Sequence, residues 1–144
     1  MTTAAAAAPA VILVDAAVLA CALVDDGADG ALARQRLAAA DSVLGLDGID
    51  QQVSAVVARL ADTGRLSEQR AEQAMADLAD LPLERVPTWP FLSLAWSLRD
   101  ACGLRAGEVV VAAAFGVTYV TADSPLAGQA ADHCQVELIS RPPG

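Results

Sequence analysis

Short apolar runs alternate along the chain with segments of helical periodicity. The first run, VILVD (11–15), is rich in β-branched residues and does not alternate apolar with polar positions, as in a strand that is buried on both faces. We expect strands at VILVD (11–15), SVLGL (42–46), LERVP (83–87), VTYVTAD (117–123) and VELIS (136–140). Strands that alternate with helices in this way predict an α/β fold, in which helices cover both faces of a mostly parallel sheet of four or five strands.

The connecting segments carry helix signals. In residues 51–64, apolar side chains recur at spacings of three and four and therefore share one helix face: Val53, Val56, Val57 and Leu60. Ser67 is a predicted N-cap for a helix that ends before Pro82, and Pro90 suits the first turn of a helix over 90–102. We expect further helices at these ranges: 16–24, 31–40, 106–116 and 125–133.

The length and the absence of a long linker or repeat predict a single domain over 10–140, between a flexible segment (1–9) and a short tail (141–144). No basic residue precedes the apolar N-terminal stretch and Asp15 interrupts it, which argues against an export signal. No other run is long and apolar enough to span a bilayer, and three scattered cysteines outside any CxxC pair suit a reducing compartment. We therefore expect a cytoplasmic protein that does not enter a membrane.

The charge balance limits the partners of the chain. Its formal net charge is −9, which is the reverse of a typical nucleic-acid binder. An RNA substrate would therefore need a local group of arginines or a bridging cation. A basic partner protein would suit the charge directly.

Two carboxylates follow strands at the edge where ligands gather in parallel sheets. Asp15 ends the first strand and Asp123 closely follows the fourth. If these strands are neighbours, the two acids converge where the strand order reverses. Converging carboxylates repel each other unless a cation neutralises them, and hard cations such as Mg²⁺ or Mn²⁺ take oxygen ligands. Alternatively, each aspartate caps the helix that follows it, and the residues alone leave both interpretations open.

The order and spacing of several segments resemble a PIN domain, specifically the ribonuclease toxins (VapC) of bacterial toxin–antitoxin pairs. The segments are VILVDAAVLACALVDDG (11–27), QQVSAVVARLADTGRLSEQRAEQAMADLADLPLERV (51–86), AWSLRD (95–100) and VTYVTADSPLAGQAA (117–131). The resemblance implies a three-layer PIN-like fold. It also implies cleavage of RNA with Mg²⁺ or Mn²⁺ held by three or four acids.

Carried over position by position, the resemblance makes Asp15 and Asp123 catalytic metal ligands. It puts Thr121 where the family often has a hydroxyl near the site. At the position of the family's glutamate this chain has Gln52, whose neutral amide neither balances a cation nor acts as a base. Asp50 and Asp47 lie close by in the sequence and are candidate substitutes.

The third acid can be aligned in two ways. Glu108 is the carboxylate available in residues 103–116, but pairing it with the family's aspartate leaves the following helix about one turn short. Counting back from Asp123 without a gap puts Arg105 there instead. Glu108 is therefore the candidate third catalytic and metal-binding acid. Arg99 and Arg105 flank its segment and are the candidate contacts for RNA phosphate.

The resemblance implies a metal-dependent endoribonuclease toxin that forms a homodimer and binds a cognate VapB-like antitoxin. Because two acidic positions are substituted or ambiguous, the alternative is a PIN-like domain with weakened or lost activity, which binds a protein or RNA as a dimer. A receiver-like phosphotransfer domain is disfavoured, since the chain has no lysine and no phosphoacceptor aspartate ending a middle strand. Trp89 and Trp96, seven residues apart, indicate core or dimer packing rather than base stacking.

Overall fold

A computed structural model gives the structure of the protein and describes residues 10–139. Five parallel strands form one sheet in the order β3-β2-β1-β4-β5. They are β1 (Val11–Val14), β2 (Ser42–Leu46), β3 (Leu83–Val86), β4 (Thr118–Thr121) and β5 (Val136–Leu138). The predicted α/β fold and every expected strand are confirmed, while the predicted flexible segment (1–9) and tail (141–144) lie outside the described residues.

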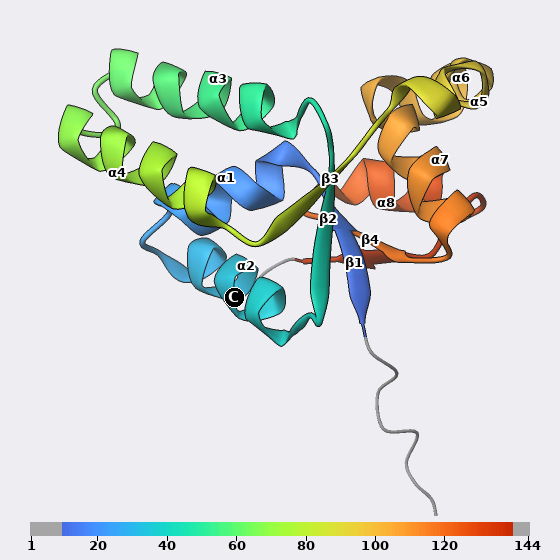
Figure 1. The fold of residues 1–144 in the computed structure, drawn as a ribbon, viewed down its shortest axis with the longest axis horizontal. Helices are drawn as coiled ribbons and strands as arrows, with labels where there is room; N and C mark the ends of the chain where they lie inside the picture. Colours follow the sequence, from blue (N-terminus) through green and yellow to red (C-terminus); the bar gives the residue numbers. More distant parts are fainter. Residues whose placement is uncertain (1–9, 140–144) are drawn as a thin grey trace, which may run out of the picture.

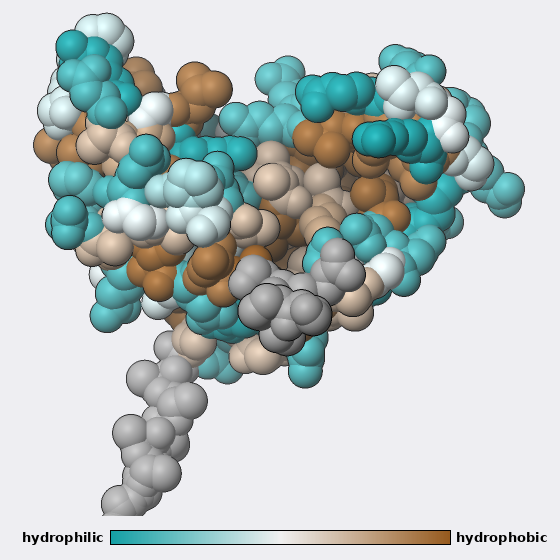
Figure 2. Space-filling view, turned by 180° about the vertical axis from the view of Figure 1, so that it is seen from behind, coloured by the Kyte–Doolittle hydropathy of each residue, from teal (hydrophilic) through white to brown (hydrophobic). Residues whose placement is uncertain are grey.

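Helices cover both faces of the sheet and make three layers (Figure 1). One layer holds α1 (Ala16–Val24), α2 (Ala28–Ala39), α3 (Ile49–Asp62) and α4 (Glu68–Asp80). The other holds α5 (Leu92–Ser97), α6 (Arg99–Cys102), α7 (Ala106–Phe115) and α8 (Ser124–Ala130), with the 3-10 turns η1 (Trp89–Phe91) and η2 (Gly103–Arg105). Seen from behind, the surface is hollowed between two lobes, and apolar side chains gather in the hollow (Figure 2).

Successive side chains of β1 point alternately into two cores, one on each face of the sheet. Ile12 and Val14 of β1 pack into the core beneath α1–α4, whereas Leu13 packs with Tyr119 into the core beneath α5–α8. All three β1 side chains are fully buried. This explains why the first strand has no polar positions: a central parallel strand has helices on both of its faces.

The strand order reverses between β1 and β4. The chain moves outward from β1 to β2 and β3 and then crosses to β4 on the other side of β1. Val14 pairs with Val120 in this parallel ladder, so the next residues, Asp15 and Thr121, emerge side by side at the carboxyl ends of the strands. The predicted neighbourhood of these two strands is confirmed, and it places the candidate site at the switch point of the sheet.

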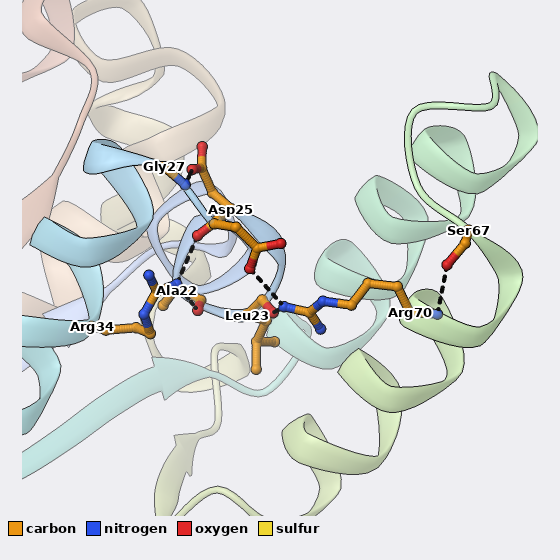
Figure 3. A network of polar contacts seen from close by, with 8 residues as sticks. Ala22, Leu23, Asp25, Gly27, Arg34, Ser67 and Arg70 are labelled. Atoms are coloured by element: carbon orange, nitrogen blue, oxygen red, sulfur yellow. Dashed lines mark hydrogen bonds and ion pairs between the residues drawn. The ribbon is translucent and has the colours of Figure 1, made fainter.

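Two arginines anchor the C-terminal end of α1 (Figure 3). Arg34 of α2 donates through Nη1 to the carbonyl oxygens of Ala22 (3.1 Å) and Asp25 (2.7 Å). Arg70 of α4 donates through Nη2 to the carbonyl oxygen of Leu23 (2.7 Å). The last carbonyls of a helix have no partner within the helix, so these contacts satisfy acceptors that would otherwise need water.

The predicted helix ends are only partly right. Ser67 caps α4 as predicted, since its hydroxyl accepts the backbone N–H of Arg70 at 3.1 Å. The predicted continuous helix over 90–102 is wrong, because the segment breaks at Leu98 into α5 and α6. Cys102 is the one buried residue within α5 and α6, so little packing holds a longer helix together. Within residues 10–139, no helix has the length and apolar character that crossing a membrane requires.

Replacing Gly30 with alanine tests the anchoring of α1. A Cβ at this position of α2 would collide with the Asp25 carbonyl oxygen that Arg34 binds, so the backbone has to move. We expect Gly30→Ala to lower the free energy of unfolding by about 1–3 kcal/mol in urea denaturation.

Gly128→Ala is the matched control, because Gly128 also lies within a helix but has nothing within 4 Å of the added Cβ. That substitution should raise the free energy of unfolding by about 0.5–1 kcal/mol. A Gly30→Ala protein as stable as wild type would contradict the close fit at the end of α1.

Candidate active site

Asp15 is buried, and its carboxylate is held by three donors. Its exposed fraction is 1%. Oδ1 accepts the backbone N–H of Val18 at 3.0 Å and so caps α1, while Oδ2 accepts the hydroxyls of Tyr119 (2.7 Å) and Thr121 (3.1 Å). These donors replace the water that a buried carboxylate loses. The helix-cap interpretation is therefore right for Asp15, and Oδ1 still has a lone pair for one further ligand.

Tyr119 is the partner of Asp15 that the sequence analysis missed. Burial raises the pKa of its phenol, and the negative charge of Asp15 raises it further, so the hydroxyl stays protonated and donates. A signal was present in the sequence, because Tyr119 and Thr121 are two residues apart in a strand and therefore point to the same face. Thr121, which was predicted to bring a hydroxyl near the site, does so.

Asp123 lies at the same edge of the sheet but faces solvent. Its Oδ1 accepts the backbone N–H of Leu126 at 3.0 Å and caps α8. Its own backbone N–H donates to the Thr121 hydroxyl oxygen at 3.2 Å, and that hydroxyl in turn donates to Asp15. One threonine thus connects the segments of both predicted acids. Among the hydrogen bonds of residues 10–139, none engages Oδ2 of Asp123, so this oxygen is available to a ligand.

Glu108 joins the site from the first turn of α7. The residue is 4% exposed. Burial raises the pKa of its carboxyl; a backbone hydrogen bond and the charge of Arg105 oppose the rise, and the charge of Asp15 adds to it. The Arg105 guanidinium is near, with 3.9 Å between its Nη1 and Oε2 of Glu108. Burial is the main cause of the raised pKa, and Arg105 is the positively charged side chain beside Glu108.

A groove of about 410 Å³ opens beside Glu108. Gln52 of α3 lies on one wall, and Trp96 and Arg99 of the α5–α6 segment lie on the other. Gln52 is exposed, so its neutral amide stands at the rim without a charge to offer a cation. Another cavity, of about 560 Å³, lies between α1, α2 and α4 and contains none of the predicted site residues.

Asp50 forms an ion pair with Arg85 and is not among the residues that line the groove beside Gln52. Its two carboxylate oxygens accept hydrogen bonds from the Arg85 guanidinium of β3 at 2.8 and 3.0 Å, and this contact lowers the pKa of Asp50. Asp47 does line the groove, where its Oδ1 accepts the hydroxyl of Thr88 at 2.8 Å. The acid that position 52 lacks is therefore not supplied by Asp50, and Asp47 is the carboxylate that the α3 side brings to the groove.

The donor atoms suit a hard cation that keeps most of its waters. Asp15, Asp123 and Glu108 offer carboxylate oxygens, and Mg²⁺ is commonly held by one or two protein carboxylates plus water. Within the described residues, however, no three His, Cys, Asp or Glu side chains come close enough together to hold a metal ion. The three-acid metal centre therefore stays a prediction.

Comparison with known proteins does not decide the family. No protein-family model matches the chain, and a search of curated proteins finds no match. The PIN-like identification remains a prediction from the sequence segments.

Replacing Glu108 with glutamine tests the cost of burying its charge. Burial makes the pKa of Glu108 higher in the folded protein than in the unfolded chain. The free energy of unfolding is therefore highest at a pH below the unfolded-state pKa, and it falls as the pH rises through the folded-state pKa. In buffer with EDTA, wild type should therefore become less stable than Glu108→Gln as the pH rises from about 4 to about 8.

Thermal unfolding at several pH values measures this difference. Glu72→Gln is the control, since Glu72 is exposed on α4 and its replacement should leave the pH profile of wild type unchanged. If the stability of Glu108→Gln depends on pH in the same way as that of wild type, the inference that burial raises the pKa of Glu108 is wrong.

Proposed function

We propose that this chain is a metal-dependent endoribonuclease with a PIN-like site at the carboxyl ends of β1 and β4. One observation carries the proposal: the buried carboxylate of Asp15 lies at the switch point of a parallel sheet, where Thr121 connects its segment with that of Asp123. Carboxylates at a switch point are a suitable site for a divalent cation and a phosphate substrate. The RNA-cleaving activity itself comes from the resemblance to VapC toxins.

Asp15 and Asp123, whose segments Thr121 connects, would hold Mg²⁺ or Mn²⁺ together with several waters, and Glu108 is the third candidate acid. When bound, such an ion lowers the pKa of a water ligand and stabilises charge on a phosphoryl oxygen. The protein's own residues orient the acids, since Tyr119 and Thr121 fix the Asp15 carboxylate by hydrogen bonds.

Two arginines are suited to hold the substrate phosphates. Arg99 lines the groove, and no carboxylate within residues 10–139 forms an ion pair with it, so its guanidinium is free for phosphate. Arg105 lies beside Glu108 and can interact with a phosphate that approaches the acids. This pair supplies the local positive charge that an RNA substrate needs on a chain of net charge −9.

The resemblance also implies a homodimer and a VapB-like antitoxin as partners. The net charge of −9 favours a basic segment on such a partner, and Glu108 and Asp123 are acids that it could contact. We include both partners in the proposal.

Purified protein, freed of bound partners, should cleave single-stranded RNA in Mn²⁺ and not in EDTA. Asp15→Asn and Asp123→Asn keep an amide oxygen that can cap the next helix but remove the charge. Each should lower the cleavage rate about 100-fold or more. Asp77→Asn, at an exposed position of α4, is the matched control and should cleave like wild type.

Cleavage that persists in Asp15→Asn would point to a contaminating nuclease and contradict the proposal, as would an inactive wild type. A non-catalytic binding module is the second candidate function. Two observations favour it: the amide of Gln52 at the groove, and the Arg105 guanidinium that already offers Glu108 a positive charge. A wild-type protein that binds RNA or a basic partner without cleavage would support this second function.

A further inference from the structure

Trp96 and Arg99 form an exposed platform outside the apolar core. Trp96 is 67% exposed, and the guanidinium carbon of Arg99 lies 4.0 Å from the centroid of its ring. Arg99 also donates through Nη1 to the backbone carbonyl of Trp96 at 2.8 Å. These two contacts hold the guanidinium over one face of the indole. Of the two roles predicted for Trp96, packing in the core is therefore wrong, and packing in a dimer stays a prediction.

The platform and the proposed active site share one groove. Trp96, Arg99 and the fully exposed Leu104 line it, and so do Gln52 and Glu108. A molecule that lies in the groove would therefore contact the aromatic platform and approach Glu108, which is the one proposed catalytic acid among the residues that line it. Trp89, which is also exposed, is not among the lining residues.

The chemistry of the platform favours an unpaired nucleotide over a second copy of the chain. An exposed indole stacks on a base of any sequence, and a guanidinium beside it contacts the phosphate. No carboxylate of the described residues forms an ion pair with Arg99, so an apolar protein surface laid over it would bury an unpaired cation. A phosphate would instead supply the missing negative charge.

We infer that this groove binds single-stranded RNA, with an unpaired base stacked on Trp96 and an adjacent phosphate at Arg99. The inference rests on the proposed ribonuclease function and names its substrate class. Double-stranded RNA does not fit this mode, because its bases are already stacked on their neighbours. The platform would position a single RNA strand so that the RNA continues past Leu104 toward Glu108.

The two tryptophans of the chain allow a direct test by fluorescence. Trp89→Phe leaves Trp96 as the sole tryptophan, and Trp96→Phe leaves Trp89, which is 74% exposed. Each protein is titrated with a short oligouridylate in low-salt buffer with EDTA, where the proposed cleavage does not proceed. The oligouridylate should quench the fluorescence of Trp89→Phe and leave that of Trp96→Phe unchanged, whereas a blunt-ended RNA duplex should quench neither.

Affinity for a fluorescein-labelled oligouridylate, measured by anisotropy, gives the second readout. Trp96→Ala should bind about tenfold or more weakly, Trp96→Phe should keep most of the affinity, and Trp89→Ala should bind like wild type. Because Trp96 is exposed, its replacement leaves the core intact, and circular dichroism checks that each variant is folded.

Several results would overturn the inference: equal quenching in both single-tryptophan proteins, unchanged affinity in Trp96→Ala, or no binding by wild type. If RNA cleavage that depends on Asp15 persists in such a protein, the proposed function stands and only the platform is wrong. A protein that neither binds nor cleaves RNA contradicts both. If Trp96→Ala turns a dimer into a monomer with unchanged affinity for RNA, the platform is an interface between copies, and the inference is overturned.

Discussion

The buried carboxylate of Asp15 is the interaction on which the rest of the site depends. A charge at the end of a fully apolar strand costs several kcal/mol unless donors compensate it. One backbone N–H at the start of α1 and two hydroxyls of β4 do so here. The same contacts fix the turn from β1 into α1 and hold the end of β1 against β4. Asp15 therefore caps α1, connects β1 to β4 and provides a carboxylate of the candidate site.

Helix α1 shows how the fold keeps that side chain in place. Asp15 provides a negative charge at its N-terminus, and Arg34 and Arg70 provide positive charges at its C-terminus, so both ends match the helix dipole. The helix is also buried over most of its length, where Val18, Leu19 and Leu23 pack into the core beside small alanines. This packing and the polar contacts at its two ends together set its position, and they also position the carboxylate at the sheet edge.

The fold was more predictable from the sequence than the site. Buried parallel strands appear as continuous apolar runs, so each strand could be found, and aspartates that follow such strands converge by topology alone. Tyr119 was missed because a tyrosine inside an apolar strand resembles any core residue until its hydroxyl has a partner. The exposure of Trp96 was also unpredictable, because helical spacing does not reveal whether another element covers a helix face.

Calorimetric titration with Mn²⁺ tests most directly whether the strand-edge acids form one cation site. The proteins to compare are wild type, Asp15→Asn, Asp123→Asn and the control Asp77→Asn. We expect one ion to bind wild type and Asp77→Asn, with an affinity reduced by the small number of protein ligands, and binding to be lost in the other two. No binding by wild type, or equal binding by all four proteins, would contradict this. Asp15 and Asp123 would then be helix caps alone.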